Sequence, residues 1–177
     1  WTQLGQDIDG EAAGDNSGIS VSLSSDGTIL AIGARWNHGN NEKSGHVRVY
    51  QWDATSNCGQ GGWTQLGQDI DGEAISDHSG RSVSLNNDGT ILAVGAPYND
   101  GTSENIRDNR GHVRVYQWNG TSWTQLGQDI DGEAAGDRSG YSVSLSSDGT
   151  IVAIGAPYNS GGGLSNGHVR VYQYANN

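Results

Sequence analysis

The chain has no phenylalanine, no methionine, one cysteine and two prolines among its 177 residues. A single cysteine, Cys58, excludes an intrachain disulfide and leaves a free thiol or a link to another chain. Apolar residues make up only 33% of the chain, and they form no run long enough to span a membrane. We therefore expect no membrane insertion in this segment.

Basic residues are also few. The chain has 9 Lys and Arg against 20 Asp and Glu, which gives a formal net charge of −11. No basic patch is available to neutralise phosphates, so nucleic acid is excluded as a partner. The excess of acid suits a soluble surface or a bound cation. The chain begins at Trp1 without a signal peptide, and we expect it to be a processed or excised piece of a longer protein.

Glycine and internal repetition are what the chain has in abundance. It contains 29 glycines, and no segment follows the 3.6-residue period of a helix. A period of about 60 residues dominates. Trp1, Trp63 and Trp123 each begin the sequence WTQLGQDIDGEA, called the tryptophan word below, and His46, His112 and His168 each begin the sequence HVRVYQ. We predict one continuous repeat domain with repeats at 1–62, 63–122 and 123–177.

Each repeat predicts four strands. Residues 82–85 alternate polar and apolar side chains, Asp88-Gly89 is a favoured hairpin turn, and residues 91–94 are apolar on both faces. Two further strands are expected at 111–118 and, as a more polar outer strand, at 123–129. Four short antiparallel strands per repeat predict an all-β fold of β-propeller blades, with the outer strand preceding the other three in each repeat.

The segment SVSLSSDGTILAIGA resembles the inner hairpin of propeller repeats, including the Trp-Asp type. The longer frame, SGxSVS followed by GAP and GHVRVY, resembles the FG-GAP repeat of integrin α-subunit propellers and related cell-surface proteins. The matching positions are Gly18, Ser20, Val21, Gly80, Ser82, Val83, Gly140, Ser142, Val143, Gly95-Ala96-Pro97 and Gly155-Ala156-Pro157.

The chain departs from the FG-GAP pattern at three points. Arg35 stands in place of the proline in the first copy, and Ser17, Ser79 and Ser139 replace the family's phenylalanine. The calcium loop of the family lies between the first two strands and needs several carboxylates. Here that loop is a turn with one aspartate, so the resemblance implies the propeller architecture and implies no calcium at that turn.

Three blades are too few to close a propeller, because the smallest have about four. An open arc leaves two sheet edges unprotected. The chain can pair with itself as a six-bladed dimer in which the outer strand of one copy completes the last blade of the other. It can also belong to a longer chain with flanking repeats, or associate head to tail as a filament.

Residues 7–15, 69–77 and 129–137 each carry four carboxylates and are called the acidic words below. Strand alternation places these acidic words and the loops beginning at Arg35, Pro97 and Pro157 on one face. Oxygen ligands of this kind can surround Ca2+, so these carboxylates form a candidate calcium site, while the simpler interpretation is that they cap turns through backbone amides. The candidate metal ligands are Asp7, Asp9, Glu11, Asp15, Asp69, Asp71, Glu73, Asp77, Asp129, Asp131, Glu133 and Asp137. We expect His46, His112 and His168 to be structural.

An aromatic residue beside an asparagine recurs on the same face. Rings stack on sugars and amides bind hydroxyls, so these pairs are candidate glycan-binding residues, with packing against the next blade as the alternative. The pairs are Trp36-Asn37, Tyr98-Asn99 and Tyr158-Asn159. Asn119-Gly120-Thr121 is a glycosylation sequon in the turn before the outer strand, and Asn119-Gly120 also suits a plain turn.

No nucleophile elbow and no phosphate-binding glycine loop is present in the sequence. We therefore predict a non-enzymatic extracellular or cell-surface protein for adhesion, scaffolding or self-assembly. A carbohydrate-binding propeller is the first alternative, and a secreted hydrolase or lyase on the same scaffold is the second.

Overall fold

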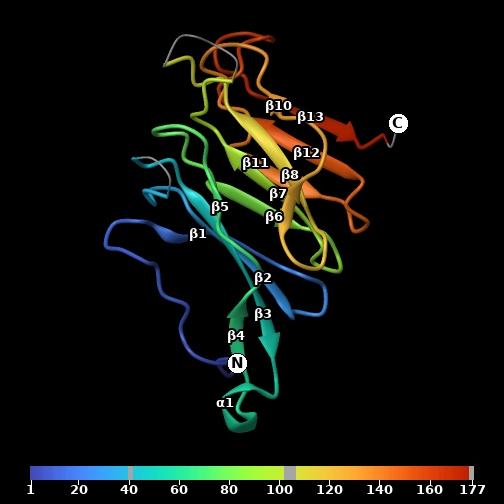
Figure 1. Ribbon diagram of the computed structural model, residues 1–177. Helices are drawn as coiled ribbons and strands as arrows, with labels where there is room; N and C mark the ends of the chain where they lie inside the picture. Colours follow the sequence, from blue (N-terminus) through green and yellow to red (C-terminus); the bar gives the residue numbers. More distant parts are fainter. Residues whose placement is uncertain (40–41, 102–106, 176–177) are drawn as a thin grey trace.

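The computed structural model describes residues 1–39, 42–101 and 107–175 and contains three antiparallel sheets that succeed one another along the chain (Figure 1). The first comprises β1 (Ser17–Leu23), β2 (Ile29–Ala34), β3 (His46–Asp53), β4 (Gly62–Gln65) and β5 (Ile70–Asp71). The second comprises β6 (Ser82–Leu85), β7 (Ile91–Ala96), β8 (His112–Trp118), β9 (Trp123–Gln125) and β10 (Ile130–Asp131). The third comprises β11 (Ser142–Leu145), β12 (Ile151–Ala156) and β13 (His168–Gln173). The all-β fold is that of a partial propeller.

The predicted inner hairpin is confirmed in the middle sheet. β6 pairs with β7, and every residue of β7 is buried, as its two-sided apolar pattern predicts. The turn is held by the Asp88 carboxylate, which accepts a hydrogen bond from the Thr90 amide at 3.0 Å. Gly89 adopts a φ of 74°, the left-handed conformation that the turn requires.

The outer strand differs from the continuous strand expected at 123–129. It is interrupted: β9 pairs with the end of β8, and β10 pairs with its beginning. Between them the chain leaves the ladder, and Asp129 turns its carboxylate to the guanidinium of Arg114 at 2.8 Å. A short turn assigned as α1 (Ser56–Gly59) lies in the β3–β4 connection.

The outer strands pair as predicted, each with the strand that precedes it in the chain. In the first two sheets the outer strand comes from the tryptophan word that follows β3 or β8 in the chain, so β3 pairs with β4 and β8 with β9. The sheets are therefore offset from the repeat boundaries at 62/63 and 122/123. Residues 1–12, the first such word, lie in no assigned strand, and the third sheet ends at β13.

The core lies between successive sheets. Val47 and Val49 of β3 are buried against Val83 and Leu85 of β6, and the same pattern recurs between the second and third sheets. Backbones approach closely at these junctions: a side-chain carbon on Gly33 would clash with the Gly80 carbonyl.

The corresponding glycine of the second sheet makes the same close approach. A side-chain carbon on Gly95 would clash with the Gly140 carbonyl. The serine before each junction bonds across it, since Ser20 Oγ donates to the Gly80 carbonyl at 2.8 Å and Ser82 Oγ to the Gly140 carbonyl at 2.8 Å. The repeated glycine and serine therefore serve the stacking of blades.

The two ends of the stack are uncovered. Val21 and Leu23 of β1 are 62% and 56% exposed, and Val169 and Val171 of β13 are 67% and 65% exposed. The chain termini lie at opposite ends of the structure (Figure 1). Within the described residues, no helix has the length and apolarity needed to cross a membrane.

Candidate functional site

The acidic words and the β2–β3, β7–β8 and β12–β13 loops meet at one end of the sheets, as predicted. Asn37 Nδ2 donates to Asp15 at 2.9 Å, and its counterparts Asn99 and Asn159 donate in the same way to Asp77 and Asp137. Parts of two loops lie outside the described residues. The aspartates at these positions also cap the turn of the acidic word, since each accepts from a backbone amide three residues before it.

The three asparagines of the predicted glycan-binding pairs are buried, each 5% exposed. The Asn37 carbonyl oxygen accepts from the Gly39 amide at 2.6 Å, and Asn99 and Asn159 make the same bond. Their polar groups are thus already used to close the loops. The neighbouring rings remain accessible, with Trp36 39% and Tyr158 43% exposed. Glycan binding stays a prediction.

The rings at this end form contacts between blades. The guanidinium of Arg138 lies 4.7 Å from the ring centre of Tyr98 and 4.5 Å from that of Tyr158. The His78 ring packs against Tyr98 at an interplanar angle of 57°, with 4.5 Å between ring centres. Burial, together with the nearby charges of Arg35 and Lys43, lowers the pKa of His78 to about 4.

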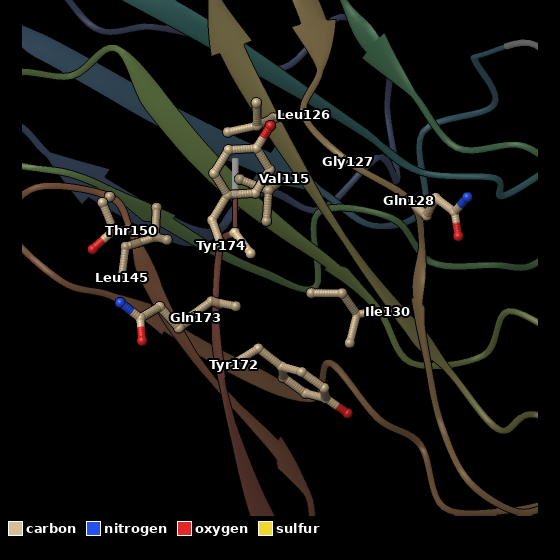
Figure 2. A pocket seen from close by; sticks show the side chains of 13 residues that line it. Val115, Leu126, Gly127, Gln128, Ile130, Leu145, Thr150, Tyr172, Gln173 and Tyr174 are labelled. Carbon is tan, nitrogen blue, oxygen red and sulfur yellow. The ribbon is translucent and has the colours of Figure 1, made fainter. Parts of the chain in front are cut away.

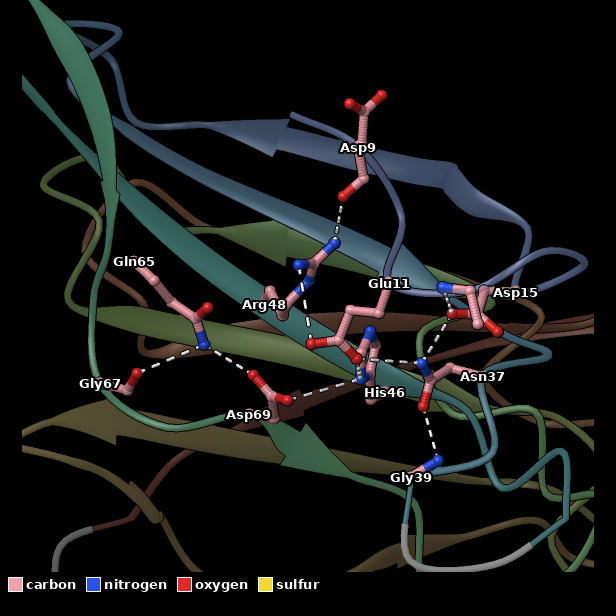
Figure 3. A network of polar contacts seen from close by, with 11 residues as sticks. Asp9, Glu11, Asp15, Asn37, Gly39, His46, Arg48, Gln65, Gly67 and Asp69 are labelled. Atoms are coloured by element: carbon pink, nitrogen blue, oxygen red, sulfur yellow. Dashed lines mark hydrogen bonds and ion pairs between the residues drawn. The ribbon is translucent and has the colours of Figure 1, made fainter. Parts of the chain in front are cut away.

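A histidine faces carboxylates in every repeat, and Figure 3 shows the first of these groups. His46 comes from β3, Glu11 from the acidic word and Asp69 from the bend between β4 and β5. His46 is 1% exposed, and its Nδ1 lies 3.8 Å from Glu11 Oε2 and 3.9 Å from Asp69 Oδ2. This Nδ1 has no hydrogen-bond partner among the described residues.

The second group joins His112, Glu73 and Asp129. Here Arg114 pairs with both Glu73 and Asp129, so a guanidinium already balances the two carboxylates. The hydrogen bond from Arg114 holds the pKa of Asp129 below its usual range. Burial, reinforced by the charge of Arg114, lowers the pKa of His112.

The third group joins Glu133, Asp137 and His168. His168 Nδ1 lies 3.7 Å from Glu133 Oε2, and Asp137 is engaged by Asn159. Within the described residues, no counterpart of Asp69 or Asp129 belongs to this group. The three His/Asp/Glu groups, one per repeat, could hold a metal ion such as Ca2+.

The remaining acidic residues of the words have other neighbours. Asp7 accepts from Gln3 Nε2 at 2.9 Å, and the Asp9 and Asp131 carbonyls accept from Arg48 and Arg170. Asp71 lies opposite His46 in the β3–β5 ladder, and burial raises its pKa. Burial also raises the pKa of Asp77.

Sequence reasoning separated the histidines from the acidic words, and the structure brings them together. β5 pairs with β3, which places the second acidic word beside His46, and β10 pairs with β8, which places the third beside His112. The sequence gives no local indication of this pairing. Long-range pairing of this kind is not encoded in local residue spacing.

Two further predicted positions lie in exposed turns. Asn119 is exposed in the β8–β9 turn, and its side-chain oxygen accepts from the amides of Thr121 and Ser122 at 2.9 Å each. Its glycosylation stays a prediction. Cys58 is exposed and unbridged in α1.

A family model for the FG-GAP repeat matches residues 8–50 and 130–172. The chain therefore contains FG-GAP repeats at these positions, and its three sheets agree with three repeats. A search of the curated proteins found no match.

Among solved structures, the chain is similar to the periplasmic gluconolactonase PpgL of Pseudomonas aeruginosa. The identity is 20% and the TM-score 0.49, and the match covers 88% of this chain and 39% of that one. The chain thus spans about two fifths of the length of that protein. A likeness of this degree says nothing about activity.

Proposed function

We propose that this FG-GAP protein is a non-enzymatic scaffold of the extracellular space or cell surface, and that it assembles through the two uncovered ends of its blade stack. The observation that carries the proposal is the pair of end faces. Each end face carries the same residue types that are buried between blades elsewhere in the chain. An exposed apolar face of this regularity is typical of an interaction surface.

The two ends are complementary halves of one interface. Val169 and Val171 at the β13 end correspond to Val47 and Val49, which are buried in the first junction. Val21 and Leu23 at the β1 end correspond to Val83 and Leu85, which form the other side of that junction. A second copy of the chain therefore offers the surface that each end lacks.

The polar and glycine positions support the same interface. Ser142 and Gly155 repeat the serine and glycine that serve the inner junctions, although no described blade follows them. Gly18, at the other end, has no atom within 4 Å of an added side-chain carbon, whereas its counterparts Gly80 and Gly140 are closely packed. Both halves of a blade junction are thus present and unused.

Light scattering at several protein concentrations tests this proposal. We expect particles of twice the 18.6 kDa chain mass if the ring closes, and larger ones if it stays open. Val171→Asp places a charge on the uncovered face and should keep the chain monomeric. Ile75→Asp is the matched control, because Ile75 is 65% exposed outside this face. A mass of one chain at every concentration would refute self-assembly.

Cation binding is a second candidate function, favoured by the buried His46 Nδ1 that lies unpartnered between two carboxylates. The acidic word alone suggests Ca2+, but an imidazole ligand favours a transition ion such as Zn2+. Titration calorimetry with each ion tests the site. We expect binding that is lost in His46→Gln and retained in His78→Gln, whose imidazole lies against Tyr98 and outside this group. Unchanged heats in both variants would refute it.

Carbohydrate binding remains the alternative to a scaffold, supported by the accessible rings of Trp36 and Tyr158. A glycan array separates the two. Binding that disappears in the Tyr98→Ala, Tyr158→Ala double variant would favour the lectin, and an array without signal would favour the scaffold.

A further inference from the structure

The tryptophan words at 63–71 and 123–131 each contact two successive blades. The word at 63–71 supplies β4 and β5 to the first sheet, and its Gly67 packs against Trp118 of the second. The tryptophan that opens the next word closes this junction: Trp123 is 4% exposed, and its Nε1 donates to the Leu66 carbonyl at 2.9 Å. A tryptophan word therefore supplies the outer strand of one blade and also packs against the next blade.

The word at 1–12 makes only half of these contacts. Gly5 packs against Trp52, and the Leu4 carbonyl accepts from Trp63 Nε1 at 3.1 Å, as expected of a word that precedes the first blade. The word at 1–12 does not act as an outer strand, since its residues pair with no strand and Trp1 is fully exposed.

The third blade has the opposite deficiency. β13 pairs with β12 alone, whereas β3 and β8 each also pair with an outer strand. At its junction with the second blade lies an apolar pocket of about 200 Å³ (Figure 2). Leu126, Tyr172 and Tyr174 line this pocket, and their counterparts Leu66, Tyr116 and Trp118 pack around the cluster that contains Trp123. This pocket corresponds to the position that Trp123 fills between the first two blades.

The group of Glu133, Asp137 and His168 lacks the aspartate that a following tryptophan word supplies in the other two repeats. Asp69 completes the group of His46 and Asp129 that of His112, but no aspartate of this type reaches His168. Asp7 is the only member of this series without a histidine among the described residues. It is already held by Gln3 at 2.9 Å, as Asp69 is by Gln65 at 2.6 Å.

We propose that residues 1–12 of a second copy form the outer strand of the third blade, with Trp1 in the pocket and Asp7 beside Glu133 and His168. This inference rests on the self-assembly proposed above and names the segment that performs it. The mode is strand addition at an open sheet edge, where backbone pairing supplies affinity and a side-chain pocket supplies specificity.

The inner blades specify the register of this pairing. Trp52 lies opposite Trp63 and Trp118 opposite Trp123, so Trp1 of the second copy lies opposite Tyr174. In the same register Thr2 of the second copy faces Gln173, as Thr64 faces Gln51 and Thr124 faces Gln117. The chain cannot satisfy its own third blade in this arrangement, because its two ends lie apart (Figure 1).

The test compares variants of the full chain by sedimentation velocity. We expect Trp1→Ala to weaken association at least about tenfold, since buried tryptophans at interfaces dominate binding. Trp36→Ala, which removes another exposed ring away from this edge, should associate like the parent chain. Val169→Lys should abolish association from the other side.

Mixing gives a sharper result. Trp1→Ala retains the open third blade and Val169→Lys retains the word, so an equimolar mixture should form a one-to-one pair that neither variant forms alone. In a Cys58→Ser background, Thr2→Cys and Gln173→Cys chains should form a disulfide in that mixture, because directly opposed strand residues lie within bridging distance. Tyr172→Cys, one residue out of register, should not cross-link to Thr2→Cys.

Two failures are distinguishable. If Trp1→Ala associates like the parent chain and no cross-link forms at Gln173, the word is not the docking segment, while assembly through the apolar faces survives. If the parent chain stays at 18.6 kDa at all concentrations, both the self-assembly and this inference are refuted.

Discussion

The middle and end blades have nearly the same sequence and opposite environments. Val113 in β8 is completely buried, whereas its counterpart Val169 in β13 is 67% exposed. Val83 in β6 is 8% exposed, and Val21 in β1 is 62% exposed. Because the residue types are the same, the difference comes from the neighbouring blade alone. Burial in a repeat stack is a property of position in the array, as nearest-neighbour models of such proteins require.

Replacing the two valines with aspartate should give the largest contrast. Val113→Asp buries an unpaired charge and should cost about 4 kcal/mol or more in the free energy of unfolding. Val169→Asp should change the stability of the single chain by less than about 0.5 kcal/mol, since the side chain lies in water. Urea unfolding at low protein concentration measures both, and equal losses would contradict the assigned exposures.

The glycines at the blade junctions give a smaller contrast. Gly95→Ala places a methyl group against the Gly140 carbonyl and should cost about 1–3 kcal/mol by overpacking. At Gly155 the neighbour is the Ser142 hydroxyl, which can rotate away because no following blade holds it. Thermal melts should therefore show a clear loss for Gly95→Ala and a loss below about 1 kcal/mol for Gly155→Ala.

The smallest contrast concerns how the stability of the chain depends on pH at one position of the repeat. Asn16, His78 and Arg138 occupy equivalent left-handed positions in the three acidic words, with φ of 62°, 57° and 53°. The pKa of His78 is lowered to about 4, mainly by burial, so between pH 6.5 and 4 the unfolded chain binds a proton that the folded chain does not. Stability should fall as the pH drops through this window and level off below it.

The loss of stability at His78 should be roughly 1–2 kcal/mol after allowance for the exposed part of the ring. His78→Asn provides the matched variant, because asparagine already occupies this conformation in the first word. Denaturant midpoints at pH 7 and pH 4.5 should differ less in His78→Asn than in the parent chain. An unchanged difference would place the pH dependence elsewhere.

Much of the fold could be predicted because its signals are local. Alternation in residues 82–85 and the Asp88-Gly89 turn define the inner hairpin without reference to the rest of the chain. The outer strand at 123–129 and the turn before it are predicted as well. The interruption between β9 and β10 could not be predicted, because residues 123–129 contain few apolar side chains whose spacing could mark the break.

The site was only partly accessible to sequence reasoning for the same reason. The convergence of the acidic words and the loops follows from strand alternation, and the Asn37–Asp15 bond confirms it. The approach of Asp69 to His46 depends on where the outer strand resumes after a break, which no periodicity encodes. The predicted capping of turns is also confirmed, because Asp15, Asp77 and Asp137 each accept a hydrogen bond from a backbone amide of the turn.

The single ladder of β13 implies that opening of the chain is graded along its length. An edge strand leaves alternate amides without a partner, and the third sheet has only three strands to lose together. Its amides should therefore exchange with deuterated solvent before those of β3 and β8, which are held from both sides. We therefore expect the third blade to open while the middle blade stays folded, and a blade added beside β13 to slow that opening without altering any residue within it.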